Sequence, residues 1–239
     1  MSLSQTQDIQ TLFDAGAHFG YARSRRHPSS APYLFGTKDR TDIFDLEETQ
    51  RRLDAAAVFI GSIPSGKQIL FVSGKHEALD IVKSAAEKAG QPYVAGRWIG
   101  GTLTNFKNIR KRIDRLQKLM QERESGELEK YTKRERLLID REIDELLGRF
   151  GGLVSMTELP SALFIVDTRH EDTAVREANQ LKIPVIGLAS SDCDFSMIQF
   201  PIPANDTSVR SISLVCERIT EACLAEKKTP STKLPAPEK

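Results

Sequence analysis

Clustered cations are the residues of this sequence whose type and spacing most clearly suggest a chemistry. Residues 96–119, GRWIGGTLTNFKNIRKRIDRLQKL, begin as a glycine-flanked aromatic loop and continue, without a later Pro or Gly, into a helical pattern. Lysine and arginine on one arm can neutralise the phosphates of a nucleic acid. The stretch therefore predicts an RNA-binding arm, although a cation run is also common on an ordinary solvated helix face. The cations of the arm are Lys107, Arg110, Lys111, Arg112, Arg115 and Lys118.

The loop before this helix and a second cluster near the N-terminus complete the predicted interface. One interpretation is that Arg97, Asn105 and Lys107 face a sugar-phosphate backbone while Trp98 packs beneath them; the other is that Trp98 simply wedges the root of the hairpin against the sheet, and the two are compatible. The second cluster lies in HFGYARSRRHPSSAP, residues 18–32, which resists regular structure. The predicted RNA-binding residues are Arg23, Arg25, Arg26, Arg97, Trp98, Asn105, Lys107, Arg110, Lys111 and Arg112.

A nucleotide site is the main competing chemistry. Residues 61–68, GSIPSGKQ, nearly match the phosphate-binding pattern G-x-x-x-x-G-K-[ST]. However, Gln68 replaces the hydroxyl that would hold magnesium, and the motif follows a predicted helix instead of a strand. Residues 73–75 after the next strand could also place a phosphate at a helix N-terminus, but the dinucleotide fingerprint G-x-G-x-x-G is absent there. We therefore predict a plain helix-to-strand connection and no bound nucleotide.

Metal and catalytic sites have weak support. The four histidines lack metal-ligand spacing, and no G-x-S-x-G or partnered cysteine nucleophile is present. Asp192, Asp194 and Asp206 could gather at one edge of the sheet and hold a cation; as the alternative, they act in turns and helix caps. We predict no cofactor, no metal and no catalytic activity.

The cationic helix has the apolar pattern of a helix that needs a helical partner. A break at Ser125 and Gly126, followed by a capping box of Thr132 and Glu135, predicts where that partner begins. Both segments have apolar residues at alternating steps of three and four, so we predict an antiparallel coiled-coil hairpin over residues 102–149. The seam positions are Ile109, Ile113, Leu116 and Met120 on the first arm, and Ile139, Ile143, Leu146 and Phe150 on the second.

Outside the hairpin, short apolar strands alternate with amphipathic helices. Such alternation predicts an α/β fold, a flavodoxin-like or Rossmann-like parallel sheet with helices on both faces, because parallel neighbours need crossovers. The expected domain has residues 1–101 and 150–225, with a disordered tail at 226–239. The predicted strands are 68–72, 93–95, 162–166, 184–188 and 200–202, and the helices between and after them are 77–89, 171–181 and 208–225.

The N-terminal segment is expected to begin with a helix at 8–17 and to continue with short strands at 33–35 and 41–44 around a turn at Gly36. A capping box of Asp45 and Glu48 then predicts the start of the next helix.

Composition indicates a soluble globular chain without a membrane span or secretory signal. The 239 residues have a net charge of +1, which is low for a nucleic-acid-binding domain, but acidic and basic residues are segregated along the chain. Cys216 and Cys223, seven residues apart on one predicted helix, are too far apart to bridge, and Cys193 stands alone; a reducing compartment follows.

Three motifs in order resemble the bacterial-type small-subunit ribosomal protein two family. They are LFDAGAHFG at 12–20, RWIGGTLTNFKNIRKRIDRL at 97–116 and LPSALFIVDTRHEDTAVREANQLKIPVIGL at 159–188, and the resemblance spans about 8–225. It implies the same α/β architecture with a protruding coiled coil. Two positions depart from the family pattern: Tyr21 stands where His is common, and Cys193 where Pro is usual. Tyr21 is not expected to take over a role of that His, and Cys193 is expected to loosen its loop.

This resemblance implies a structural constituent of the small ribosomal subunit with a role in translation. It would bind small-subunit rRNA on the back of the subunit near the junction of head and body, beside neighbouring ribosomal proteins. In some bacteria, the large mRNA-recruiting ribosomal protein also docks on this family. The expected location is a cytoplasmic ribosome or that of an organelle. The rival hypothesis is a Rossmann-like nucleotide-binding enzyme whose hairpin is a dimerisation arm, with its ligand beyond the carboxyl ends of the strands.

Overall fold

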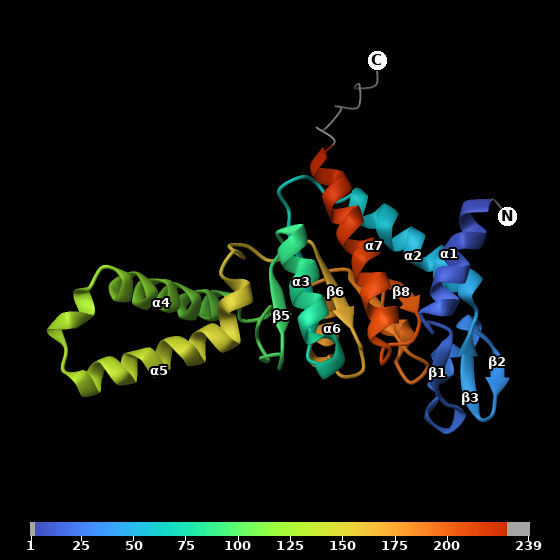
Figure 1. Cartoon of the computed structure of the whole chain (residues 1–239), viewed down its shortest axis with the longest axis horizontal. Helices are drawn as coiled ribbons and strands as arrows, with labels where there is room; N and C mark the ends of the chain where they lie inside the picture. Colours follow the sequence, from blue (N-terminus) through green and yellow to red (C-terminus); the bar gives the residue numbers. More distant parts are fainter. Residues whose placement is uncertain (1–2, 229–239) are drawn as a thin grey trace, which may run out of the picture.

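A five-stranded parallel sheet forms the centre of the computed structural model, which describes residues 3–228 (Figure 1). Numbered along the chain, its strands follow the order 2-1-3-4-5 that is typical of flavodoxin-like sheets. The prediction of a parallel α/β fold is therefore confirmed. In spatial order, the strands are β5 (Tyr93–Ala95), β4 (Ile69–Ser73), β6 (Ala162–Val166), β7 (Val185–Ala189) and β8 (Phe200–Pro203).

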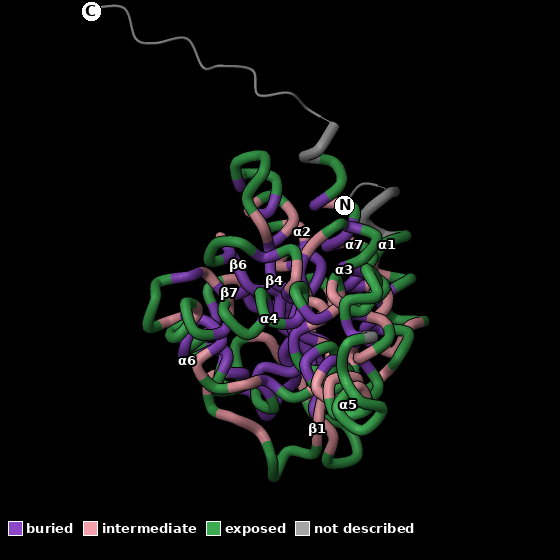
Figure 2. Tube along the Cα trace, turned by 90° about the vertical axis from the view of Figure 1, so that its left-hand side faces the viewer, coloured by how far each residue is buried: buried purple, intermediate pink, exposed green. Residues whose placement is uncertain are grey.

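Two apolar layers cover the sheet, one on each face. Alternate residues of a strand point to opposite faces, so Ile69 and Phe71 pack in one cluster while Leu70 and Val72 pack in the other. Both sets are buried, which explains why the strands are continuous apolar runs in the sequence. Figure 2 shows this buried interior running along β4, β6 and β7 beneath an exposed outer surface. The first layer contains α1 (Leu3–Asp14), α2 (Leu46–Gly61), α3 (Leu79–Ala89) and α7 (Val209–Lys228), and the second contains α6 (Asp172–Gln180).

Two long helices, α4 (Phe106–Glu124) and α5 (Lys133–Phe150), project from the second layer at one end of the molecule (Figure 1). The chain runs outward along α4 and returns along α5. The Thr132 and Glu135 capping box is present, as predicted. Six of the eight predicted seam positions are buried, whereas Met120 and Ile139 are partly buried, and Leu119 is buried in addition. The two helices therefore have seven buried residues. These are Ile109, Ile113, Leu116, Leu119, Ile143, Leu146 and Phe150.

The N-terminal segment folds differently from the prediction. β1 (Phe19–Ala22), β3 (Thr41–Phe44) and β2 (Leu34–Lys38) form a small antiparallel sheet, and β1 was not predicted. The turn at Gly36 was wrong: Gly36 lies within β2, and the hairpin turns at Asp39 and Arg40, which both have positive φ. A two-residue turn with that backbone matches the twist of its flanking strands.

Several boundaries also differ. The Asp45 and Glu48 capping box is wrong, because Asp45 accepts from the Glu47 N–H while the Glu48 carboxylate pairs with Arg51 and Arg52. Helix α7 continues to Lys228, into the predicted tail, and the remainder of that tail lies outside the described residues. The connecting 3-10 turns are η1 (Arg23–Arg25), η2 (Pro28–Tyr33), η3 (His76–Ala78), η4 (Glu127–Lys130), η5 (Gly151–Leu153) and η6 (Phe195–Met197). None of the helices within residues 3–228 has the length and apolar character needed to cross a membrane.

Candidate nucleic-acid interface

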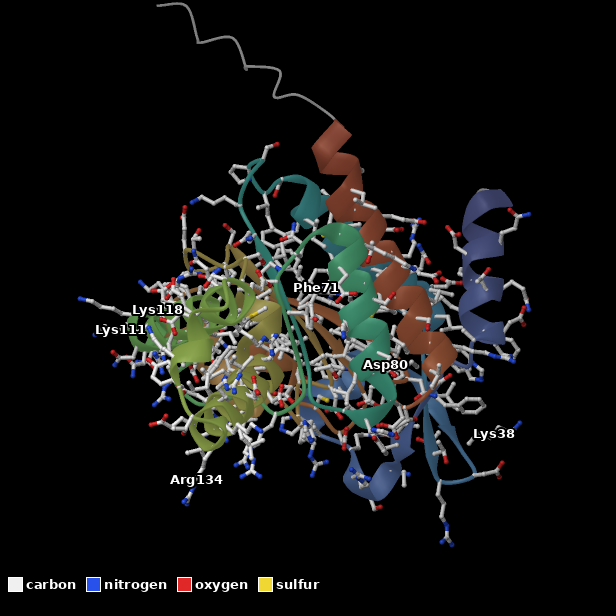
Figure 3. All side chains as sticks on the ribbon, turned by 60° about the vertical axis from the view of Figure 1, so that its left-hand side comes forward. Lys38, Phe71, Asp80, Lys111, Lys118 and Arg134 are labelled. Carbon is white, nitrogen blue, oxygen red and sulfur yellow. The ribbon has the colours of Figure 1, made fainter. Side chains whose placement is uncertain are left out.

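The outer side of α4 carries cations that face solvent. The buried residues of α4 define its inner side, and a period of 3.6 residues places Lys107, Lys111 and Lys118 within roughly 40° of one another on the opposite side. Figure 3 shows the side chains of Lys111 and Lys118 extending away from the body of the protein. Within the described part of the chain, Lys107, Lys111 and Arg112 have no carboxylate within 4.0 Å. Their charges are therefore available to an anionic partner.

Arg110 is engaged by the protein itself. Its Nη1 donates to the carbonyl oxygens of Val154 at 3.2 Å and Met156 at 3.0 Å, and its Nε donates to Asp114 at 2.9 Å. Arginine can satisfy several acceptors at once because its guanidinium carries five donors in a fixed fork. Arg110 thus fastens α4 to the chain that follows α5, and it differs in this from its predicted companions.

The loop that leads into α4 is organised by a buried carboxylate that the sequence reading missed. Glu177 of α6 accepts from the Trp98 indole at 3.1 Å and from the backbone N–H groups of Gly101 at 2.7 Å, Leu103 at 3.0 Å and Thr104 at 3.1 Å. The Thr104 hydroxyl adds a fifth donor at 3.1 Å. One side chain therefore ties the root of the hairpin to the sheet domain. The only sequence signal was an acid on the otherwise apolar inner side of α6.

Glu177 remains ionised because these donors outweigh its burial. Burial alone would raise the pKa of Glu177, but the hydrogen bonds from Thr104, Gly101, Trp98 and Leu103 lower it overall. The negative charge of Glu177 is stabilised by hydrogen bonds from N–H and O–H groups, without an arginine partner among the described residues.

Trp98, Arg97 and Asn105 have distinct positions around this loop. Trp98 is 8% exposed and packs in the core, in agreement with the interpretation that it wedges the root of the hairpin against the sheet. Arg97 is exposed and, among the described residues, has no carboxylate within 4.0 Å. Asn105 precedes α4 and accepts from the Asn108 side chain at 2.9 Å without capping the helix.

The cations of the N-terminal loop face acids of the same protein. Arg26 forms a bidentate pair with Asp42, which is fully buried, including an Nε–Oδ2 contact of 2.7 Å. Arg25 donates to the buried Asp192 at 2.9 Å, and Arg169 donates to the same oxygen at 2.6 Å. Arg23 is exposed and, in the described part of the chain, has no such acid partner. The structure does not bring this cluster to the hairpin: β1–β3 and α4–α5 lie at opposite ends of the molecule (Figure 1).

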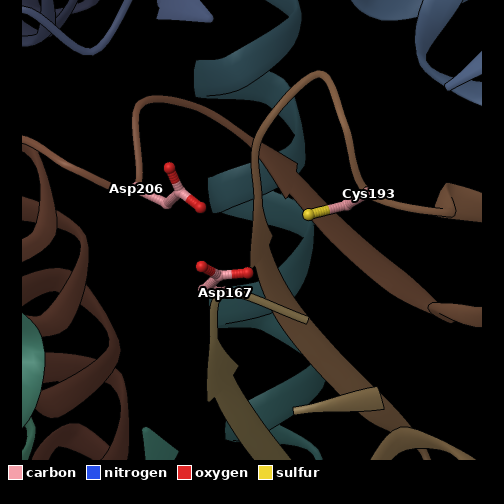
Figure 4. A group of neighbouring side chains, drawn as sticks. All are labelled: Asp167, Cys193 and Asp206. Carbon is pink, nitrogen blue, oxygen red and sulfur yellow. The ribbon is translucent and has the colours of Figure 1, made fainter. Parts of the chain in front are cut away.

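The carboxyl ends of the sheet strands hold a charged cluster where a nucleotide enzyme would bind its ligand. Lys75 Nζ lies 3.1 Å from both Asp167 Oδ2 and Asp206 Oδ2, and 3.3 Å from the Tyr21 hydroxyl. Figure 4 shows the two carboxylates and the Cys193 thiol turned toward one another. Their three candidate ligand atoms lie within 4.8 Å. Burial and the Asp167 charge raise the pKa of Asp206 to about 7, although Lys75 opposes them.

This cluster is not the cation site that the sequence suggested. Asp192 is taken by two arginines, and Asp194 caps η6 by accepting from Ser196. Asp206 has the Lys75 ammonium beside it, so a fixed cation already balances the acids at this edge. Cys193 is fully buried, which raises the pKa of its thiol to about 12, and is therefore a poor thiolate ligand.

The near-match to a phosphate loop is a connection between elements. It begins at Gly61, the last residue of α2, and ends just before Ile69, the first residue of β4. A phosphate loop needs the opposite order, a strand followed by a helix. The predicted helix-to-strand connection is confirmed.

Comparison with known proteins agrees with the three motifs. The family model of "Ribosomal protein S2" matches residues 12–226. "Small ribosomal subunit protein uS2" of Roseiflexus sp. (strain RS-1) is 42% identical over 217 residues, covering 90% of this chain and 83% of that protein. The protein of the same name from Chloroherpeton thalassium is also 42% identical over 217 residues, with 90% and 87% coverage. The one from Coprothermobacter proteolyticus is 39% identical, with 90% and 81% coverage.

These matches extend across both the sheet domain and the hairpin, and they replace the hypothesis of a nucleotide-binding enzyme. The chain belongs to the ribosomal protein S2 family, which comprises structural, non-enzymatic proteins of the small ribosomal subunit with a role in translation.

Proposed function

We propose that this chain is a structural constituent of a cytoplasmic small ribosomal subunit and that it binds small-subunit rRNA mainly through α4 and the loop before it. The observation that carries the proposal is that four solvent-facing cations lie within residues 97–112 without an acid partner within 4.0 Å among the described residues: Arg97, Lys107, Lys111 and Arg112. The family supports the ribosomal identity, and these free charges support the proposed position of the RNA surface.

Binding would rely on phosphate neutralisation and shape. Each lysine or arginine that contacts a phosphate releases condensed counterions, which favours association and makes it weaken with salt. Folded RNA is recognised largely through its backbone and shape, so a fixed array of cations is a suitable partner. Glu177 supports that array by holding the loop at 97–105 in one conformation.

We further propose that α4 and α5 form a rigid coiled-coil arm. The buried seam and an ion pair of Arg115 with Glu142 at 3.1 Å connect the two helices along their length. A rigid arm would place its cations at fixed separations. An isolated surface ion pair adds little stability, so the apolar seam would provide most of it.

The N-terminal loop would make a smaller contribution. Arg23 and the half-exposed Arg25 are the cations there that RNA could reach, whereas Arg26 is held by Asp42. Neighbouring ribosomal proteins are the other expected partners. Docking of the large mRNA-recruiting ribosomal protein stays a prediction from the resemblance.

The test compares full-length protein with a variant carrying Lys107→Ala, Lys111→Ala and Arg112→Ala. Affinity for small-subunit rRNA is measured by filter binding at several salt concentrations. We expect weaker binding and a salt slope smaller by up to about three phosphate contacts. An unchanged slope and affinity would remove α4 from the interface. Lys88→Ala with Arg210→Ala, exposed cations on α3 and α7, is the matched control.

A further inference from the structure

A hollow at the root of the hairpin has the chemistry of a second contact for RNA. It lies between the end of α5, the edge of the sheet at β5 and helix α3, and has a volume of about 550 Å³. Of its charged lining residues, Arg97 was predicted to bind RNA, whereas Lys83 and Arg149 were not. It is lined by residues from three separate segments of the chain.

The charged side chains of the hollow are mostly basic. Lys83 of α3, Arg97 of the hairpin loop and Arg149 of α5 face a single acid, Asp144, so the lining has a net charge of +2. Lys83 and Arg97 have no carboxylate within 4.0 Å among the described residues. Arg149 pairs with Glu145 at 3.0 Å, but both partners are more than half exposed, and such pairs exchange easily.

Four other hollows on the described surface have a less positive net charge. Three hollows along α1, α2, α3 and α7 are lined by more acids than cations, with net charges of −2, −3 and −2. The hollow around Arg25 and Asp192 has four arginines and three aspartates, and each of those arginines is paired with an aspartate. Of these five hollows, the one at the root of the hairpin is the one with two lining cations that have no acid partner among the described residues.

Glycines leave the wall of this hollow open. A Cβ added at Gly96 or Gly148 would meet no atom within 4 Å, so the main chain is directly accessible there. Gly152 is the opposite case, because its Cβ would overlap the Tyr93 carbonyl, and this close packing keeps η5 against β5. An open, glycine-lined wall lets a ligand's backbone approach the protein closely.

We propose that this hollow binds a segment of the sugar-phosphate backbone of rRNA, with Lys83, Arg97 and Arg149 as the phosphate contacts. The inference rests on the proposed function, since it extends the RNA surface of α4 across the hairpin root to the edge of the sheet. Arg97 belongs to both surfaces, which makes them continuous.

Gly148 offers a sharp test because it lies inside helix α5 with open space around it. Gly148→Glu and Gly148→Lys place side chains of similar length and opposite charge in the hollow, and both should keep or raise the melting temperature because glycine is a poor helix former. We expect Gly148→Glu to weaken binding to small-subunit rRNA by about fivefold or more and Gly148→Lys to bind at least as tightly as the wild type. Gly148→Ala controls for the loss of glycine.

The double variant Lys83→Ala with Arg149→Ala should reduce the salt dependence of rRNA binding by the slope that corresponds to up to about two phosphate contacts. The control variant Lys88→Ala with Arg210→Ala should leave this slope unchanged. If the Gly148 variants bind like the wild type while the α4 triple variant is impaired, the hollow is wrong and the proposed function stands. If neither set has an effect, both fail. If Gly148→Glu blocks incorporation into subunits but not binding to free rRNA, the hollow faces a protein and the inference is overturned.

Discussion

The N-terminal loop and the root of the hairpin neutralise their buried acids in different ways. In the loop, arginines neutralise Asp42 and Asp192, so most of its positive charge is used inside the fold. At the hairpin root, Glu177 accepts only from amides, an indole and a hydroxyl. Arg97 beside it therefore stays free of acid partners within the described chain. Two basic clusters that look alike in sequence thus differ in how much charge they can offer to RNA.

The two regions also differ in what holds them in shape. The helices α4 and α5 bury apolar residues between them, and Lys107, Lys111 and Arg112 have no acid partner among the described residues, whereas Lys118 lies 3.7 Å from Glu122. The segment at 18–32 was predicted to resist regular structure, but it contains β1 and two 3-10 turns, and ion pairs to buried aspartates hold its Arg25 and Arg26 in place. This contrast leads to four expectations, given from the largest effect to the smallest.

Ile113→Asp should have the largest effect, a local loss of stability in α4 and α5. Ile113 is fully buried, and an unpaired carboxylate there should cost about 4 kcal/mol locally. Hydrogen exchange should show faster exchange of α4 and α5 amides, while the sheet stays protected. Exposed Leu137→Asp on α5 is the control. Unchanged protection in α4 would mean that the seam does not hold the arms together.

Arg26→Ala should destabilise the protein by about 3 kcal/mol, because it leaves the fully buried Asp42 without its guanidinium partner. Urea denaturation at neutral pH measures the change. Arg112→Ala, which removes a cation without a partner, should stay within about 0.5 kcal/mol of the wild type. Equal effects of the two substitutions would contradict the distinction between internal and free cations.

Glu177→Gln should cost about 2 kcal/mol, because an amide offers one acceptor oxygen to five donors and turns its own N–H₂ toward them. Because the pKa of Glu177 is lowered in the folded protein, the stability that its carboxylate contributes depends on pH. Its stabilisation is present above the unfolded pKa of about 4.3 and is lost as the pH falls through the lower folded pKa.

The stability gap between wild type and Glu177→Gln should therefore narrow in acid. A gap of the same size at pH 3 and pH 7, measured by urea denaturation, would show that the carboxylate charge is not involved.

Arg110→Ala and Lys111→Ala should separate stability from RNA binding within one turn of α4. Loss of the hydrogen bonds to the Val154 and Met156 carbonyls should cost about 1 kcal/mol in the first variant, with little change in salt slope. The second should keep its stability and reduce the salt slope by about 0.9. The reverse pattern would assign Arg110 to the RNA and Lys111 to the fold.

Local patterns were sufficient for the regular elements. Strands at 93–95 and 162–166 were predicted to the residue, because short apolar runs bounded by breakers have few other solutions. The β2–β3 turn was missed because Asp39 and Arg40 adopt positive φ without a glycine, while Gly36 lies in the strand. Strand β1 was missed because its partner, β3, is about twenty residues away, and pairing over that distance has no local signal.

The sequence by itself determined the order of strands and helices in the five-stranded sheet, the sign of the charge on α4 and the family, because periodicity, charge and motifs are properties of neighbouring residues. Which cations remain free was decided only by the tertiary structure. The arginines that pair with Asp42 and Asp192, and the groups that donate to Glu177, are mostly far from these acids in the sequence. Folding brings them together. The hollow lined by Lys83, Arg97 and Arg149 also depends on the tertiary structure. Its cations come from three segments that meet only when α5 returns to the edge of the sheet.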